Sequence, residues 1–276
     1  MRVVKGLLDR SLELLGLLAR DAGWHRLSSI AQRLQLQSGP AHRLLAELMR
    51  LGWVEQEAST DRYRLTLKLS LLGQQFLYAT GLPGMVQPIL DSLAARCGEL
   101  VRLTVVQGDA LYWFASSQGA PPGLMYQPSM TSHPQLHATA NGKAWLATLP
   151  DETAVAIALE GGLADGGGTS KTIHTVQGLV RELALTRRRG YGLSVEEAEA
   201  GVRAIAIAIA PPGAPAVGTM SIGGPLLRMG KSRDAALHQM LMQAGEQLQV
   251  CWPTAPTLYA STLKAQRESA KSQETV

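Results

Sequence analysis

Three amphipathic helical patterns followed by two short strand patterns fill the first 66 residues of this 276-residue chain. Apolar residues recur at intervals of three and four between residues 6 and 48, the spacing of helices with one buried face. Two short strands around a polar turn follow, at 53–55 and 63–65. This order predicts a winged helix-turn-helix domain at residues 4–66, with the helix-turn-helix at about 27–46.

The same patterns suggest where these helices begin and which face is buried. Ser28 or Ser29 is expected to cap the second helix, because a side-chain oxygen satisfies free backbone N–H groups there. Ser38 or Gly39 is expected to cap the third helix, with Pro40 in its first turn. The buried stripe expected for the first helix consists of Leu8, Leu12, Leu15 and Ala19.

The third helix of a winged helix typically enters the major groove of double-stranded DNA. Its solvent side here is polar, which favours DNA over the alternative of a bundle that contacts protein. Basic residues near the wing and the second helix are placed where phosphate contacts are expected. The residues expected to contact DNA are Ser28, Ser29, Gln37, Ser38, His42, Arg43, Arg62 and Arg64.

The remainder of the chain predicts a second, mixed domain, so the fold class is α+β. A helical pattern at 67–81 is expected to link the domains, and a helix from about Met85 to open the second one at 82–253. Two strand-like runs with a short turn, further helical stretches and a final amphipathic helix follow. The polar segment 261–276 is expected to be a disordered tail.

Residues 201–210, GVRAIAIAIA, alternate strictly and therefore predict a strand with two different faces. One face carries isoleucines and the other carries alanines such as Ala204. Small side chains leave volume on the alanine face. Either a ligand or a packed helix can fill it.

Composition narrows the protein class. Hydrophobic residues make up 46% and charged residues 17%, which excludes a disordered chain. A net charge of +4 permits a nucleic-acid partner without establishing one. Cys97 and Cys251 are the only cysteines, which excludes a disulfide scaffold and fits a reducing cytoplasm. The sequence has no apolar run of about 18 residues and no signal-peptide pattern, so we expect a cytoplasmic protein with no membrane partner.

Catalytic and metal-binding motifs are missing from the sequence, so we predict no enzyme activity, cofactor or metal. His133 and His137 have i, i+4 spacing, but Pro134 argues against a helix and no third ligand accompanies them. His137 is expected to be structural or to hydrogen-bond in a pocket. Glu196 and Glu197 are adjacent and should face opposite ways, so we expect a solvated loop edge rather than a carboxylate pair.

Several motifs follow one another along the chain: LSSIAQRLQL (27–36), LGWVEQ (51–56), DRYRLTLKL (61–69), LHATANGKAWLA (136–147), RRRGYGLSVEE (187–197), AGVRAIAIAI (200–209) and GTMSIGGP (218–225). In order and spacing they resemble those of the IclR-type regulators, and the resemblance covers about residues 4–253. It implies a winged-helix DNA-binding domain joined by a helix to an effector domain resembling a GAF fold. It also implies a homodimer or homotetramer that acts on operator DNA.

Departures from the family pattern bear on the effector. Ser194 stands where the family often has an acid, Ala204 where a cysteine is frequent, and Gly223 at the second of two small polar positions. Because these positions contact small carboxylate effectors in relatives, the resemblance implies a roomier, less polar pocket that suits an aromatic or larger acid. Tyr126 and Trp145 line this pocket or belong to the core. The expected effector-binding residues are Met125, Met130, His137, Ser194, Ala204, Ser221 and Gly223.

These observations predict a ligand-responsive transcriptional regulator of a catabolic operon that senses a small organic acid, aromatic acids included. Two alternatives remain open. The second domain can serve only to oligomerise the protein, or the chain can be an enzyme that carries a DNA-tethering module. The regulator is expected to act as a repressor or as an activator.

Overall fold

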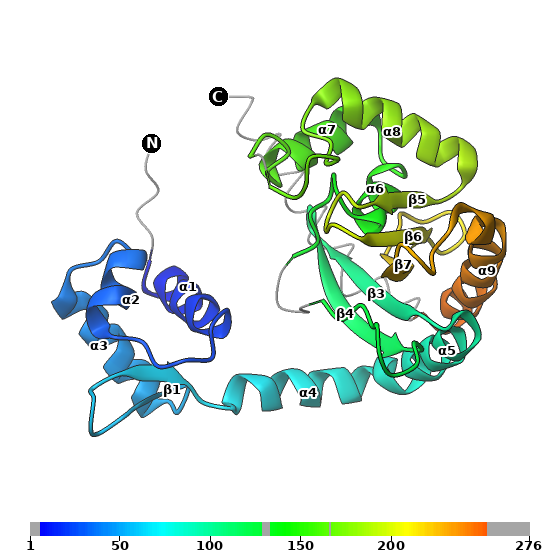
Figure 1. Ribbon diagram of the computed structural model, residues 1–276. Helices are drawn as coiled ribbons and strands as arrows, with labels where there is room; N and C mark the ends of the chain where they lie inside the picture. The colour runs from blue at the N-terminus through cyan, green and yellow to red at the C-terminus, as the bar shows by residue number, and fades with distance from the viewer. Residues whose placement is uncertain (1–5, 129–132, 166, 253–276) are drawn as a thin grey trace. The chain divides into compact units, whose positions relative to one another are not determined.

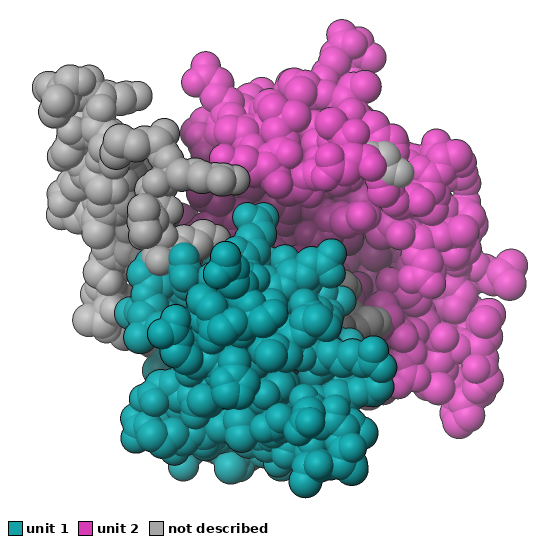
Figure 2. Space-filling view, turned by 90° about the vertical axis from the view of Figure 1, so that its left-hand side faces the viewer, with its two compact units in different colours: residues 1–81 teal, residues 82–276 magenta. Residues whose placement is uncertain are grey.

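The computed structural model describes residues 6–128, 133–165 and 167–252. The chain forms two compact units, residues 1–81 and residues 82–276, which have separate colours in Figure 2. Within the described ranges, no helix is both long and apolar enough to cross a membrane. The predicted tail from residue 261 lies outside the described residues.

The first unit is a winged helix-turn-helix, as the sequence predicts. Its two strands pair in antiparallel register, with Val54 opposite Leu65. His25 and Tyr63 exchange two backbone hydrogen bonds of 2.8 Å, which tie the wing to the segment before the second helix. The elements, labelled in Figure 1 where there is room, are α1 (Leu7–Ala19), α2 (Leu27–Arg33), α3 (Ser38–Arg50), β1 (Val54–Gln56) and β2 (Tyr63–Leu65).

The buried face of α1 differs from the expected one. Leu14 and Leu18 are buried in the core of the first unit, whereas Leu8 and Leu12 are 71% and 60% exposed. The reason is that α1 carries leucines on more than one side, so helical spacing alone fits two different stripes. Packing against the other helices and the wing selects the stripe that contains Leu14 and Leu18.

The helix caps also differ from the expected ones. Arg26 and Gln37 are the N-cap residues of α2 and α3, and neither side chain makes a capping hydrogen bond. Both helices therefore begin earlier than predicted, which places Ser28 and Ser29 in the first turn of α2 and makes Ser38 the first residue of α3.

Helix α4 (Lys68–Thr80) is the predicted linker helix, and none of its residues is buried. It ends at Gly81, whose φ of 70° lies in the left-handed region that glycine adopts readily. Helix α5 (Leu82–Cys97) follows directly. It begins three residues earlier than Met85, the predicted start, because Pro83 is tolerated in a first turn.

The second unit is built on a five-stranded antiparallel sheet in the order β4-β3-β7-β6-β5. The alternation of residues 201–210 predicted β6, which lies between β7 and the edge strand β5, whereas β5 and α7 had no recognised signal. The elements after α5 are β3 (Leu100–Gln107), β4 (Ala110–Gln118), α6 (Ala140–Leu146), α7 (Asp151–Glu160), α8 (Val176–Arg189), β5 (Gly192–Val195), β6 (Val202–Ile209), β7 (Gly218–Pro225), the short 3-10 helix η1 (Lys231–Arg233) and α9 (Asp234–Cys251).

The two faces of the sheet carry different helices (Figure 1). The isoleucines of β6, among them Ile207, form a core with α5 and α9. On the opposite face, Ala206 packs against Ala140 and Ala144 of α6. The volume that small side chains leave near Ala206 is therefore filled by a helix, whereas Ala204 packs only partly against this cluster and is half-buried, so the end of β6 near Ala204 remains a candidate for a ligand.

We expect Gly192→Ala to destabilise the second unit, because a Cβ atom at Gly192 would lie 2.2 Å from the carbonyl oxygen of Ala140 and 2.7 Å from the backbone nitrogen of Ala144. Overpacking of this kind costs about 1–3 kcal/mol of unfolding free energy. Chemical denaturation measures the loss. Gly84→Ala in α5 is the matched control, since a Cβ there meets no atom within 4 Å. Equal stabilities of the two variants would contradict this packing.

Candidate functional site

The exposed side of α3 forms a polar surface in the first unit. Gln37, Ser38, His42 and Arg43 are all exposed there, as expected for residues that read a groove. Because no side chain caps the start of α3, its first backbone N–H groups are free to bind an anion such as a DNA phosphate.

The two outward-pointing arginines of α3 have different surroundings. Arg50 donates to Glu47 at 2.5 Å, so its charge is compensated within the helix. Arg43 makes no ion pair within the described part of the chain. The charge of Arg43 is therefore available to an external partner, such as a guanine edge.

In the wing, the side chain of Arg64 already has partners within the chain. Arg64 on β2 donates to Glu55 at 2.5 Å, and its guanidinium lies 4.2 Å from the centre of the Trp24 ring. A phosphate contact by Arg64 would require exchange of this partner. Arg62 is half-buried, and its carbonyl accepts a backbone hydrogen bond from Glu57. Contacts of Arg62 and Arg64 with DNA stay predictions, as do those of the exposed Ser28 and half-buried Ser29.

A second candidate site lies on the sheet face that α6 covers. Cross-strand partners point to the same face of a sheet, so the register places the expected residues in two adjacent rows. One row joins Ser194, Ala204 and Gly223 across β5, β6 and β7. The next row joins Ala206 and Ser221. The structure thus brings together four residues that the motifs placed in the effector site: Ser194, Ala204, Ser221 and Gly223.

The polar groups of this face have different roles. The Ser194 hydroxyl donates to the carbonyl of Ala138 at 2.7 Å, which anchors the segment before α6. Ser221 is only 3% exposed, and its hydroxyl has no hydrogen-bond partner among the described residues. Ser194 therefore has a structural contact, whereas the described part of the chain assigns none to the Ser221 hydroxyl.

Tyr126 covers the end of the row at Gly223. A Cβ atom at Gly223 would lie 3.4 Å from the Ala204 Cβ and 3.6 Å from the Tyr126 ring. Met125 beside it is 40% exposed, and Met130 lies outside the described residues. Trp145 packs in the core of α6, α7 and α8, so it belongs to the core rather than to a pocket.

His137 is buried just before α6, and neither of its ring nitrogens has a hydrogen-bond partner in the part of the chain that is described. Burial lowers its pKa, and the nearby His174 and Lys143 lower it further. His133 instead packs edge-on against Tyr112, 4.9 Å between ring centres. The described residues include no group of three or more His, Cys, Asp or Glu placed to hold a metal.

Glu197 does not lie on a solvated loop edge as expected. Its carboxylate accepts hydrogen bonds of 2.6 and 2.7 Å from Lys143, which is 1% exposed on α6. Burial raises the pKa of Glu197, and Lys143 opposes that shift. Glu196 does face the other way, toward Lys171. The sequence signal for this ion pair was the single lysine within the apolar stretch of α6.

The sequence analysis also missed Arg102 in the middle of β3. Arg102 is only 8% exposed and lies opposite Ser221 in the register. Its guanidinium is 3.6 Å from the centre of the Trp113 ring and 5.8 Å from that of Tyr126. A lone arginine within the apolar run LVRLTVV was the available signal. The second row of the sheet face therefore ends in a buried positive charge.

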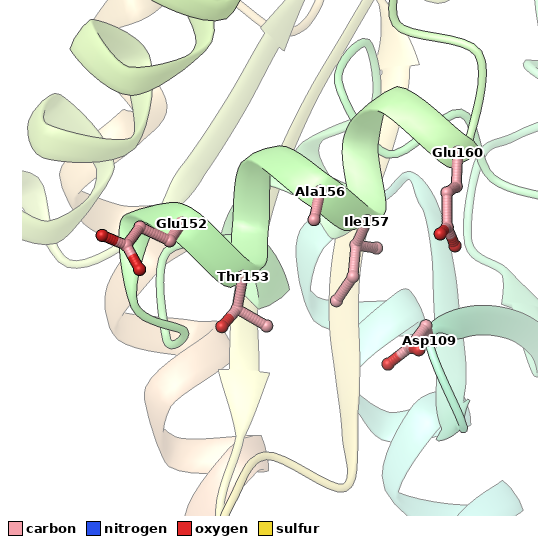
Figure 3. Close-up of a pocket in the computed structure, with 6 residues that line it drawn as sticks. All are labelled: Asp109, Glu152, Thr153, Ala156, Ile157 and Glu160. Atoms are coloured by element: carbon pink, nitrogen blue, oxygen red, sulfur yellow. The ribbon is translucent and has the colours of Figure 1, made fainter. Parts of the chain in front are cut away.

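A separate hollow of about 360 Å³ lies outside this face, between α7 and the turn that joins β3 and β4 (Figure 3). In Figure 3, Ile157 and Glu160 extend from α7 on the side of Asp109, whereas Glu152 extends away from it at the other end of the helix. Glu152 and Glu160 make the lining acidic, which disfavours an organic acid. None of the sequence-predicted effector residues lines this hollow.

Comparisons with known families match nearly the whole chain. Residues 7–58 match the model of the IclR helix-turn-helix domain, and residues 74–250 match that of the bacterial transcriptional regulator IclR C-terminal domain. The HTH-type transcriptional regulator BhcR of Paracoccus denitrificans is 31% identical over 87% of this chain and 85% of its own length. The transcriptional repressor IclR of Escherichia coli is 28% identical, with 89% of both chains covered.

Solved structures share the fold. A crystal structure of an IclR homologue from Microbacterium hydrocarbonoxydans, complexed with 4-hydroxybenzoate, superposes with a TM-score of 0.70. The alignment covers 89% of this chain and 98% of that chain at 21% identity. This likeness supports the order of the elements described above.

We expect Arg43→Ala to weaken specific DNA binding by about 1–3 kcal/mol if Arg43 contacts a base. Arg50→Ala is the matched control, because Arg50 lies on the same helix but is paired with Glu47. Fluorescence anisotropy with a duplex selected from a random library by the wild-type protein measures both affinities. Equal losses in the two variants, or no loss in Arg43→Ala, would refute the assignment of Arg43.

Proposed function

Because the chain belongs to the IclR family of bacterial transcriptional regulators, we propose that it controls a catabolic operon in response to a small organic acid. The first unit binds operator DNA through α3, and the second unit binds the acid on the sheet face at Ala204, Ser221 and Gly223. The observation that carries this proposal is the hydroxyl of Ser221, which accepts and donates no hydrogen bond among the described residues although the residue is only 3% exposed. The hydroxyl is not fully enclosed, so a ligand that reaches this face can supply the hydrogen bond that polar groups in such positions normally make.

The range of acids follows from the size of the neighbouring side chains. Ala204 and Gly223 present little more than backbone on this face, and the Tyr126 ring lies against them. A flat acid fits beside an aromatic ring. The Microbacterium homologue with bound 4-hydroxybenzoate supports the inclusion of aromatic acids.

The proposal includes a homodimer or homotetramer, which the apolar surface of α4 supports. Leu69, Leu72 and Phe76 recur at helical spacing on α4 and are 37%, 53% and 54% exposed. Because a second copy of the chain offers the same surface, two such helices can bury these side chains against each other. A symmetric pair also places two winged helices on paired half-sites.

We expect Ala204→Phe to abolish the response to the effector while DNA binding persists, because the larger side chain occupies the proposed site. A thermal-shift screen of aliphatic and aromatic monocarboxylates identifies ligands, since a ligand that binds only the folded protein raises its melting temperature. Anisotropy with the selected duplex then measures the response. The effector and the DNA must change each other's affinity by the same factor.

The outcomes of this screen separate the alternatives. A variant Ala204→Phe that responds normally would move the effector site elsewhere. Tight DNA binding that no acid alters would favour a second unit that only oligomerises. Chemical turnover of a bound acid would favour an enzyme with a DNA-tethering module.

We expect Phe76→Asp to dissociate the oligomer, because a charge in the centre of a paired apolar surface is costly to bury. Sedimentation velocity at micromolar concentration measures the change. Gln75→Asp adds the same charge to a neighbouring exposed position of α4 and serves as the control. A monomeric wild-type protein would refute the oligomer, and an intact Phe76→Asp oligomer would place the interface elsewhere.

A further inference from the structure

Arg102 is the one charged side chain of β3, and its burial calls for an explanation. The strand places Arg102 between Val101 and Leu103, both of which are fully buried in the core on the other side of the sheet. Burying a charge without a counter-ion is costly, because the protein interior solvates a charge less well than water does. A protein that keeps such a charge normally pairs it.

Other arginines of the second unit that are buried or half-buried are paired. Arg203, on the opposite sheet face, donates to both oxygens of Asp234 at 2.5 and 2.8 Å. Arg189 donates to Glu182 at 2.6 Å, and Arg228 donates to both oxygens of Glu99. Each of these guanidinium groups therefore has a carboxylate partner in its own chain.

Arg102 makes no ion pair with any carboxylate among the described residues. The hydroxyl of Tyr126 contacts it, and Glu199 acts on it more weakly from an exposed position. Burial is the largest influence on the pKa of Arg102 and lowers that pKa. The guanidinium thus has no direct carboxylate partner among the described residues, because the carboxylate of Glu199 acts on it only at a distance and through the Tyr126 hydroxyl.

The neighbours of Arg102 form a site for a planar anion. Trp113 and Tyr126 present ring faces to the guanidinium. Stacking on aromatic rings fixes the orientation of the guanidinium plane, and N–H groups in that plane can still donate hydrogen bonds. Ser221 lies directly opposite on β7 with a hydroxyl that has no described partner. Two residues further along β7, Gly223 adds no side chain to this face.

We propose that Arg102 binds the carboxylate of the effector, with the Ser221 hydroxyl as a second donor to the same group. This inference rests on the proposed function and adds a residue and a requirement: the effector binds as the ionised acid, and a neutral analogue of the same shape binds poorly. The body of the acid then lies beside the Tyr126 ring, which already covers Gly223. Arginine suits this role because its planar fork matches both oxygens of a carboxylate.

The test compares an acid with its neutral amide. Melting temperatures of the full-length wild-type protein are measured with sodium benzoate, sodium acetate, benzamide and acetamide, at ionic strength matched with sodium chloride. Benzoate, acetate or both should raise the melting temperature, whereas the corresponding amide should not. Titration calorimetry with the active acid should show at least about 30-fold weaker binding to Arg102→Met, the loss expected when one partner of a buried charge pair is removed.

Two further variants guard against a trivial loss of structure. Arg187→Met removes an arginine that already has a partner, Asp151, and should leave binding of the acid unchanged. Arg102→Lys keeps the charge but loses the planar fork, so it should bind the acid several-fold more weakly than the wild type. Without ligand, Arg102→Met should melt at or above the wild-type temperature, because it removes a buried charge without a carboxylate partner.

The proposal is overturned if neither acid stabilises the wild type, if the amide acts as well as the acid, or if Arg102→Lys binds the acid unchanged. A large fall in the melting temperature of ligand-free Arg102→Met would also overturn it, since Arg102 would then have a structural role. The proposed regulatory function fails separately. That function is contradicted if acids bind through Arg102 but leave the DNA affinity of the protein unaltered. If an acid still changes the DNA affinity of Arg102→Met, only the role of Arg102 is contradicted.

Discussion

The close packing of α6 on the sheet is the contact on which the second unit depends. It is made by small residues, with Gly192 and Ala206 on the strands facing Ala140 and Ala144 on the helix. Because the helix backbone lies so near the strands, the buried amine of Lys143 reaches the carbonyl of Leu193 and the carboxylate of Glu197. Ala204 packs partly against the same alanines of α6, and the Tyr126 ring lies over Gly223 at the other end of that row.

Residue spacing predicted much of this architecture. The winged helix, the linker helix and the two-faced strand β6 followed from apolar periodicity, because local spacing determines which residues can share a face. Spacing failed for α1, where leucines at several positions fit more than one stripe. It also gave no signal for β5, a strand of four residues, because so short a segment shows no clear alternation.

The candidate site was only partly predictable for a different reason. Motif order located Ser194, Ala204, Ser221 and Gly223, yet only the register showed that they form adjacent rows and that the Ser194 hydroxyl is already bonded. Arg102 lies 119 positions before Ser221 in the sequence and opposite it in the sheet. A pairing at such a distance along the chain is a property of the tertiary fold and leaves no local pattern.

Helix α4 has a thermodynamic consequence of its own. It has 13 residues and no buried side chain, and isolated helices of this length are marginally stable in water. Packing within the chain therefore contributes little to its helicity. If two copies cover each other's α4, helix formation and association become one equilibrium. The helical content of the segment would then rise with protein concentration, so dilution would loosen the connection between the DNA-binding unit and the sensor.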